Sequence, residues 1–224
     1  MNVSEAVASR RSVRGFLDRP VDLDLLRDIL ARATRAPSGG NLQPWTLHVV
    51  ADEQMAALRA LMARRLVEAP DGEGTEYDIY PKALGSPYRE RRFGVGEALY
   101  ARLGIPREDK DGRKRWFARN FQFFGAPVAL FCYIERSHGP PQWSDCGMLL
   151  QTIMLLLREA GLDSCPQECW ALYSRTIDAF VGAPPEQMLF TGMSIGWADP
   201  ADPANALESP RAPVGEVIHF HAGR

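Results

Sequence analysis

The sequence predicts a globular protein in which helices and strands are mixed along one chain. Three apolar runs, at 46–50, 128–134 and 187–195, have the length and composition typical of strands. Longer segments with apolar side chains at helical spacing lie before and between them. The chain has 224 residues, 46% of them hydrophobic, which is enough to bury a substantial core. This length suits one large domain or two small ones.

The first two helices are predicted from capping residues and apolar spacing. Residues 3–7 place apolar side chains at helical spacing behind the capping residue Asn2, so a short helix should end near Arg10. A second helix should begin at Asp22, and Pro37 should end it. Its expected buried stripe consists of Leu25, Leu26, Ile29, Leu30 and Ala33.

The later helices follow from the same kind of pattern. Residues 52–69 and 174–181 are expected to be helical. Residues 143–160 are apolar nearly all round, which predicts a helix that runs through the core and ends at Gly161. The stretch 162–170 mixes polar and apolar residues, and we expect it to be irregular.

The carboxy-terminal segment has no clear internal pattern. Residues 197–213 are rich in proline and alanine, and a strand-like run follows only at 217–220. A structureless stretch of this length is unusual inside a compact domain. We therefore expect this tail to pack on something else, such as a second subunit.

Composition narrows the classes of function. A net charge of -2 argues against a surface built for nucleic acid or for an acidic membrane. Neither a signal peptide nor a membrane-spanning run is indicated. No CxxC pair or nearby histidine accompanies the four cysteines, Cys132, Cys146, Cys165 and Cys169. We expect no metal site and a reducing, cytoplasmic location.

Several catalytic motifs are missing from the sequence. There is no Walker sequence, and the segment 94–99 lacks the third glycine and the preceding strand of a dinucleotide fingerprint. No GxSxG or cysteine–histidine signature accompanies the histidines, and His48 lies in a predicted strand, which favours a structural role. Hydrolase and metalloenzyme functions therefore have no positive support.

Three arginines and a serine are concentrated in residues 10–14. Arginine presents a rigid fork of donors that matches phosphate oxygens, and it stays charged near neutral pH. If the chain is extended here, Ser12 and Arg14 point to one side and Val13 to the other. The cluster therefore indicates either a site for an anion or a strongly solvated surface.

A second polar motif lies in the loop 37–45, between a predicted helix and a predicted strand. Gly39 and Gly40 allow the backbone to approach a ligand closely. Ser38, Asn41 and Gln43 supply donors and acceptors that suit a heterocycle. These residues are also ordinary turn formers, so the loop alone favours a simple turn.

The segment 70–125 is rich in arginine and aromatic residues. Between residues 89 and 119 there are ten Lys or Arg against five Asp or Glu, a surplus of five positive charges. A nucleic-acid module has this composition, but solvated helix faces have it more often.

Two motifs, in order, resemble a known family. The segments Arg10–Phe16 and Ala36–Trp45, separated by one predicted helix, closely resemble the FMN-dependent nitroreductase family. The branch that contains nitrobenzoate-type nitroreductases is the most similar. The resemblance continues through 104–110, 120–127 and 192–211, so it covers nearly the whole chain.

The resemblance implies an α+β fold with a central, mostly antiparallel sheet wrapped by helices. It also implies an interlocked homodimer with exchanged carboxy-terminal segments and FMN sites at the interface. The chain would form a single domain over 1–224. That domain would carry a helical, arginine- and aromatic-rich insert at about 70–125 and a dimer-wrapping tail at about 197–224.

The resemblance also implies which residues bind FMN. The phosphate and ribityl end would be held by Arg10, Arg11, Ser12 and Arg211. Arg14 would reach the pyrimidine edge of the flavin, where negative charge appears on reduction. Two further groups complete the expected site: Ser38, Gly39, Gly40, Asn41 and Gln43 from the other subunit, and Pro166, Gln167 and Glu168 beside the ring.

The insert is expected to cover the open face of the flavin and to select aromatic or anionic substrates. The residues expected there are Tyr80, Arg89, Arg92, Asn120, Phe121 and Phe123. Asn120 is also a candidate for a polar contact to the flavin. Ordinary packing of a lid explains these residues equally well.

The implied activity is an FMN-dependent oxidoreductase that uses NADPH or NADH. Hydride would pass through flavin N5 to nitroaromatic or quinone-like acceptors by a ping-pong route, with no catalytic side chain. Reductive dehalogenation, enone reduction and flavin fragmentation are alternatives within the same fold. A flavin-binding protein without turnover is an alternative of another class.

Overall fold

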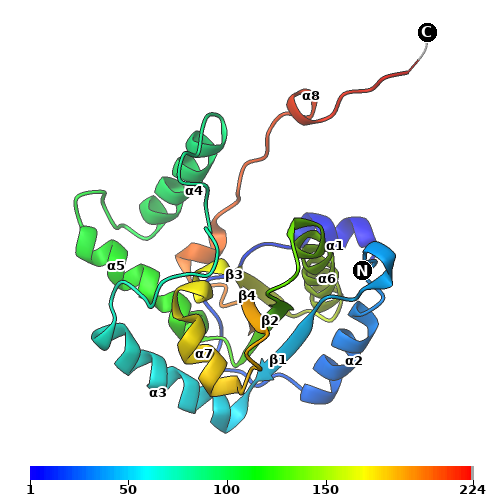
Figure 1. Ribbon diagram of the computed structural model, residues 1–224. Helices are drawn as coiled ribbons and strands as arrows, with labels where there is room; N and C mark the ends of the chain where they lie inside the picture. Colours follow the sequence, from blue (N-terminus) through cyan, green and yellow to red (C-terminus); the bar gives the residue numbers. More distant parts are fainter. Residues whose placement is uncertain (223–224) are drawn as a thin grey trace.

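The computed structural model describes residues 1–222 and has a four-stranded sheet at its centre (Figure 1). The strands are β1 (Thr46–Val50), β2 (Val128–Glu135), β3 (Asp163–Gln167) and β4 (Gln187–Gly196), in the order β1-β2-β4-β3. Each neighbouring pair of these strands is antiparallel. The prediction of an α+β fold with a mostly antiparallel sheet is therefore confirmed.

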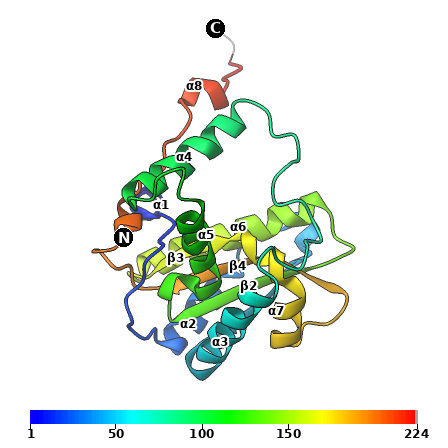
Figure 2. The ribbon, with the colours of Figure 1, turned by 90° about the vertical axis from the view of Figure 1, so that its left-hand side faces the viewer.

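Helices cover both faces of the sheet (Figures 1 and 2). The α-helices are α1 (Val3–Ser9), α2 (Leu23–Ala33), α3 (Asp52–Glu68), α4 (Tyr88–Arg102), α5 (Lys110–Ala118), α6 (Pro140–Glu159), α7 (Ser174–Val181) and α8 (Val214–Val217). Short 3-10 helices are η1 (Gly39–Asn41), η2 (Arg119–Gly125), η3 (Glu168–Tyr173) and η4 (Pro203–Ala206). Within residues 1–222, no helix combines the length and the hydrophobicity needed to cross a membrane.

The first helices begin where their capping residues predict. Asn2 and Glu5 form a reciprocal capping box at the start of α1, with hydrogen bonds of 2.8 and 2.9 Å. Asp22 caps α2 by accepting from two backbone amides. Helix α6 begins three residues before the predicted position, because Pro140 is well suited to the first turn of a helix.

Strand β2 separates two hydrophobic clusters. Alternate residues of the strand, such as Phe131 and Leu130, point to opposite faces, and both are fully buried. Helices α2 and α6 pack on one side, and α3 and α7 pack on the other. Burial on both faces explains why the sequence of β2 is continuously apolar.

Two expectations from the sequence are wrong. Residues 163–167, expected to be irregular, form the edge strand β3. The pattern was hidden because Ser164, Cys165 and Gln167 are all buried, so polar and apolar residues do not alternate; Pro166 is tolerated because the strand lies at an edge. The run 217–220 is also not a strand, because Val217 ends the one-turn helix α8 and the next residues have no strand partner among the described residues.

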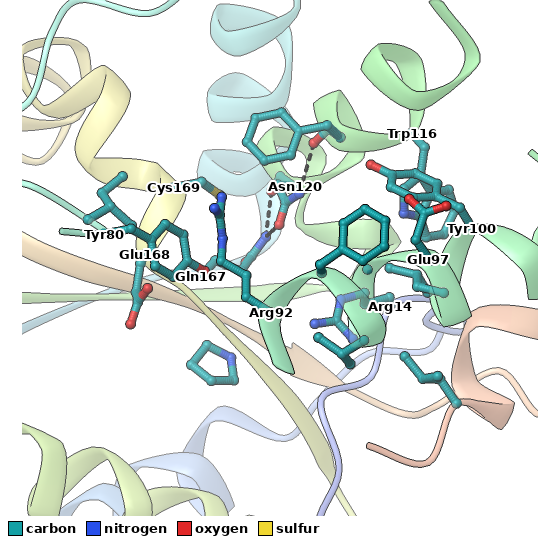
Figure 3. Close-up of a pocket in the computed structure, with 18 of the residues that line it drawn as sticks. Arg14, Tyr80, Arg92, Glu97, Tyr100, Trp116, Asn120, Gln167, Glu168 and Cys169 are labelled. Carbon is teal, nitrogen blue, oxygen red and sulfur yellow. Dashed lines mark hydrogen bonds between the residues drawn. The ribbon is translucent and has the colours of Figure 1, made fainter. Parts of the chain in front are cut away.

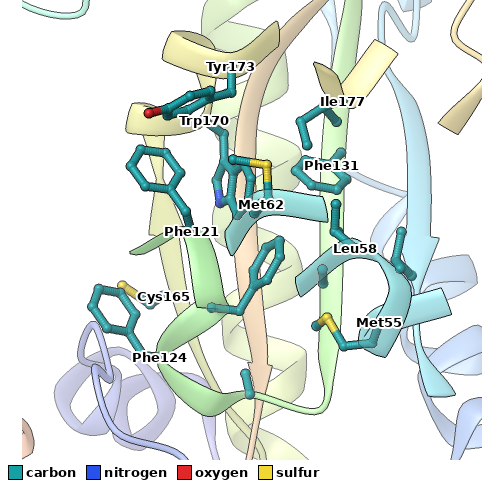
Figure 4. Close-up of a cluster of buried hydrophobic side chains, with 14 of the residues drawn as sticks. Met55, Leu58, Met62, Phe121, Phe124, Phe131, Cys165, Trp170, Tyr173 and Ile177 are labelled. Atoms are coloured by element: carbon teal, nitrogen blue, oxygen red, sulfur yellow. The ribbon is translucent and has the colours of Figure 1, made fainter. Parts of the chain in front are cut away.

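The cluster on the α3 side contains a group of aromatic rings around Trp170 (Figure 4). Phe123 stacks on Trp170 at 4.5 Å between ring centroids, and Phe121 contacts the indole edge-on at 5.2 Å. Gly192 permits this arrangement, because a Cβ there would lie 2.3 Å from Cδ1 of Trp170. The indole therefore packs directly on the backbone of β4.

The insert between α3 and β2 projects from the rest of the molecule (Figure 2). Helix α4 has no buried residue. It is tied to α5 by Arg113, whose guanidinium donates to both carboxylate oxygens of Glu97 at 2.5 and 3.1 Å. Helix α4 is thus joined to α5 by an ion pair, while Leu99 and Tyr100 pack their partly buried side chains against the hydrophobic cluster on the α3 side.

The chain enters the insert at Glu73, which is anchored between α3 and α7. Its carboxylate accepts from Arg65 of α3 at 2.6 Å and from the backbone and hydroxyl of Thr176 of α7. Burial alone would raise the pKa of Glu73, but these hydrogen bonds together outweigh it and lower the pKa. The ionised form of Glu73 therefore stabilises the fold.

We predict that Glu73→Gln lowers the free energy of unfolding at pH 7 by about 1–2 kcal/mol, because charged hydrogen bonds are lost and Arg65 is partly solvated. Since the folded pKa lies below the unfolded one, this contribution is present above about pH 4.3 and disappears as the pH falls through the folded pKa. Urea unfolding at pH 7 and at acidic pH measures the difference. The matched variant Glu90→Gln, in an exposed pair with Arg89, should change little. A constant difference between Glu73→Gln and the wild type at all pH values would contradict the prediction.

Candidate functional site

A cavity of about 840 Å³ lies between the insert and the end of β3 (Figure 3). Its walls come from the amino-terminal segment, from α4, α5 and η2, and from the end of β3 and the adjoining η3. Eight of the residues singled out in the sequence line it: Arg14, Tyr80, Arg89, Arg92, Asn120, Pro166, Gln167 and Glu168. Segments far apart in the chain are thus brought to one site.

The arginine cluster lies on an extended segment beside β3. Ser12 forms a parallel bridge with Ser164, and the amide of Val13 donates to the Ser164 carbonyl at 3.0 Å. The side chain of Val13 is buried, whereas Ser12 and Arg14 on either side of it are only partly covered. This alternation, which the sequence predicts, directs two polar side chains away from the core.

The cationic groups of this segment are not neutralised. Among residues 1–222, no acidic side chain forms an ion pair with Arg10, Arg11 or Arg14. Arg11 donates to the Asn205 carbonyl at 3.1 Å, and Arg14 donates to the Ser12 carbonyl at 3.3 Å. The guanidinium of Arg10 and the hydroxyl of Ser12 donate no hydrogen bond within the described part of the chain. Three positive charges and a hydroxyl held together in this way suit an anion such as phosphate.

Gln167 forms the polar floor of the cavity. Its Nε2 donates to the carbonyl and to Oδ1 of Asn120 at 2.8 and 3.2 Å, and its Oε1 accepts from Ser194 at 2.7 Å (Figure 3). Asn120 in turn donates to the Phe117 carbonyl at 2.8 Å. This network fixes the position of the Gln167 side chain. Both donors and the acceptor of its amide are satisfied by other groups of the protein.

The residues beside the floor are partly withdrawn from solvent. Burial raises the pKa of Glu168, although part of its surface remains exposed. Burial is also the main cause of a strongly raised pKa of Cys169, so this thiol stays protonated near neutral pH. Cys169 is therefore not suited to act as a nucleophile in this structure.

The roof carries an arginine without an acidic partner. The guanidinium of Arg92 lies 4.0 Å from the centre of the Tyr80 ring, as in a cation–π contact. Arg89, by contrast, pairs with its neighbour Glu90, and within the described chain no carboxylate pairs with Arg92. The roof thus presents one free positive charge beside an aromatic ring.

Two expected substrate residues, Phe121 and Phe123, do not reach the cavity. Both side chains are buried in the aromatic cluster around Trp170, with exposures of 2% and 0%. Residues 123 and 124 adopt left-handed backbone angles, with φ of 52° and 53°, and the turn directs Phe123 inward while Phe124 lines the cavity. The expectation that Phe121 and Phe123 contact the substrate is therefore corrected: both are core residues. No local sequence pattern marks such a turn at phenylalanine.

The loop expected to bind FMN lies outside this cavity. Gly40, Asn41 and Gln43 have left-handed φ angles of 58°, 57° and 51°. The amide of Gly39 donates to the buried carboxylate of Asp145 at 3.2 Å, and Ser38 accepts from the amide of Gln43 at 3.0 Å. The loop is thus firmly shaped, but one copy of the chain does not bring it to the arginine cluster.

Arg211 is likewise separate from the arginine cluster. It lies on the extended tail and donates only to the neighbouring carbonyls of Ser209 and Pro210 among the described residues. Cavity residues that the sequence analysis missed include Phe93, Glu97, Trp116, Phe124, Cys169 and Leu207. They come from several elements, so only the three-dimensional fold groups them.

Comparisons with known proteins agree with this geometry. The family model described as "Nitroreductase family" matches residues 7–197. The chain is 35% identical over 218 residues to a nitrobenzene nitroreductase of Ectopseudomonas oleovorans, covering 97% of this chain and 96% of that protein. It is 38% identical over 214 residues to a 4-nitrobenzoate reductase of Pseudomonas putida, covering 96% and 93%.

A solved structure is similar over its whole length. It is the FMN and NADPH-dependent nitroreductase NfnB from Sphigopyxis sp. strain HMH, with a TM-score of 0.96, 53% sequence identity and coverage of 100% of both chains. The insert, the sheet and the tail of the present chain are therefore all included in the match.

Proposed function

Because the chain belongs to the nitroreductase family, we propose that it is an FMN-dependent oxidoreductase that uses NADPH or NADH to reduce nitroaromatic or quinone-like compounds. One observation carries this proposal. The guanidinium groups of Arg10 and Arg14 have no acidic partner in the described chain, and they lie with the Ser12 hydroxyl beside a cavity whose polar floor, Gln167, is held by hydrogen bonds. The names of the similar proteins support FMN as the cofactor and NADPH as an electron donor.

The residues present fit FMN. A flavin mononucleotide has a phosphate at one end and a ring with donor and acceptor edges at the other. Arg10, Arg11 and Ser12 offer charge and donors for the phosphate, and no acidic group in the described chain competes for them. Arg14 lies at the wall of the cavity, and Pro166 and Glu168 form its edge.

We assign distinct roles to these residues. Arg10, Arg11 and Ser12 bind the phosphate, and Arg14 donates to the pyrimidine edge. FMN held by these residues would supply the hydride chemistry between a nicotinamide donor and the acceptor. The Arg14 guanidinium stabilises the negative charge at that edge, and the cavity walls exclude water from the ring.

We further propose that a second copy of the chain completes the site. Asn41 and Gln43 hold left-handed backbone angles on an exposed loop, and backbone strain of this kind is often associated with function. The tail that carries Arg211 exposes apolar side chains, including Val217 and Phe220. An exposed apolar tail and a shaped loop far from the cavity are the features expected of a chain that pairs with a copy of itself.

The shape of the cavity supports the proposed order of events. It is one open space. Arg14 lies at its wall, the Arg92–Tyr80 pair forms its roof, and Gln167 forms its floor. A nicotinamide donor and a flat acceptor would occupy the same space in turn, which corresponds to a ping-pong route. The free charge of Arg92 beside an aromatic ring suits acceptors that are aromatic and electron-poor or anionic.

The direct test is to purify the protein, record its absorbance spectrum and mix it anaerobically with NADPH or NADH. We expect a yellow protein whose flavin bands bleach with one or both nucleotides and return when a nitroarene or a quinone is added. A halophenol and oxygen alone serve as comparison acceptors. A colourless protein that takes up no FMN contradicts the proposal. Bound FMN that neither nucleotide bleaches indicates a flavin-binding protein without turnover.

We predict that Arg10→Gln weakens FMN binding by roughly ten- to a hundredfold, because one or more charged hydrogen bonds to phosphate are lost. Fluorescence titration of the flavin-free protein measures the dissociation constant. The matched variant Arg64→Gln, on the exposed side of α3, should bind FMN as the wild type does. Equal affinities for Arg10→Gln and the wild type would show that Arg10 does not contact the phosphate.

We predict that Arg14→Ala lowers the reduction potential of bound FMN, because the positive charge that stabilises the reduced cofactor is removed. The potential is measured by reductive titration against a reference dye, at FMN concentrations that keep the variant saturated. Arg10→Gln, also saturated, should shift the potential less, since phosphate lies far from the ring. An unchanged potential in Arg14→Ala would refute the division of roles between the two arginines.

A further inference from the structure

Asn205 binds the arginine-bearing segment from the opposite end of the sequence. Its Oδ1 accepts from the amide of Arg14 at 2.7 Å, and its Nδ2 donates to the carbonyl of Gly15 at 2.8 Å. The backbone carbonyl of Asn205 accepts from Arg11 at 3.1 Å. A second bond from Nδ2 to the Asp199 carbonyl, at 2.9 Å, holds the side chain itself.

These bonds fill a gap in the backbone pairing of the segment. The amide of Val13 donates to Ser164 of β3, and the amide of Phe16 donates to the Phe124 carbonyl. Arg14 has no such strand partner, and its amide donates to Asn205 instead. A primary amide carries an acceptor and two donors, so it can replace the peptide group of a neighbouring strand at this point.

The position of Asn205 is itself fixed. The residue is buried, with 9% exposure, within the 3-10 helix η4. Asp202 caps this helix by accepting from the Ala204 amide at 2.9 Å, and its other oxygen pairs with Arg119 at 3.3 Å. Asp202 also lies so close to Gly15 that a Cβ on Gly15 would be 2.2 Å from its carboxylate. The two segments therefore approach as closely as a glycine permits.

We propose that Asn205 is a positioning residue that directs the Arg14 guanidinium into the cavity and thereby sets the reduction potential of bound FMN. This inference rests on the proposed function. Asn205 does not line the cavity, so it acts through Arg14 and not by touching the cofactor. The backbone of Arg14 is held at its amide by Asn205, and its guanidinium is held only at the Ser12 carbonyl among the described residues.

A purely structural role predicts different results. If Asn205 only stabilised the fold, its loss would lower the unfolding temperature and leave the properties of bound FMN unchanged. The matched control is Tyr133→Phe, which removes a hydrogen bond of 2.9 Å to Asp178 in a part of the fold that does not line the cavity. Tyr133→Phe should lower stability without changing the affinity or the potential of FMN.

The test compares Asn205→Ala, Arg14→Ala and the double variant, each saturated with FMN. We expect Asn205→Ala to weaken FMN binding roughly three- to tenfold, because about one hydrogen bond between Arg14 and FMN would be lost. We also expect it to lower the reduction potential of FMN, as Arg14→Ala does. In the double variant the potential should equal that of Arg14→Ala alone, because the two residues act in series. An unchanged potential in Asn205→Ala, or additive shifts in the double variant, would overturn the inference.

A measurement on the wild type keeps the inference testable if Asn205→Ala does not fold. In the flavin-free protein the amide hydrogen of Arg14 should exchange slowly with solvent, because it is bonded to a buried side chain. Rapid exchange would refute the proposed hold of Asn205 on the Arg14 amide, and this test needs no variant. If the wild type binds no FMN at all, the proposed function fails, but slow exchange would still establish the contact between Asn205 and Arg14.

Discussion

The structure depends on the way its extended amino-terminal segment is held. Residues 12–16 hydrogen-bond with Ser164 on one side and with Asn205 on the other, at separations of roughly 150 and 190 residues in the chain. The Phe16 amide joins the segment to η2, where the insert ends. A short stretch with no regular secondary structure thus connects the sheet, the insert and the start of the tail. These hydrogen bonds hold Arg14 at the wall of the cavity.

Local sequence patterns predicted those helices and strands whose burial follows a regular pattern along the chain. The strand Thr46–Val50 and the helix Ser174–Val181 have the predicted bounds, and β2 was recognisable because burial on both faces makes it continuously apolar. Strand β3 was missed because it is a buried edge strand that contains a proline. Phe121 and Phe123 were misplaced because both pack on Trp170 in the core, and the left-handed turn that directs Phe123 inward has no signal in the sequence. In these cases long-range packing decided the outcome.

The residues predicted for the site also fall into two groups, those that meet at the cavity and those that do not. The family resemblance predicted Arg14, Gln167 and Glu168 as site residues, and these do meet at one cavity, whereas the loop at 38–43 and Arg211 lie elsewhere on the same chain. The family resemblance assigns the loop at 38–43 to the other subunit, and its position outside the cavity of its own chain is compatible with that expectation. Asn205 has no motif of its own, and its importance follows only from the atoms it contacts.

The floor and the roof of the cavity differ in how much change the fold tolerates. At the floor, Gln167 pairs with Gly192, and Trp170 occupies the space that any side chain at Gly192 would need. At the roof, α4 has no fully buried residue, so substitutions at its exposed positions change stability by less than about 0.5 kcal/mol. The packing around Gly192 therefore constrains the sequence at the floor, whereas the exposed positions of the roof accept many different side chains.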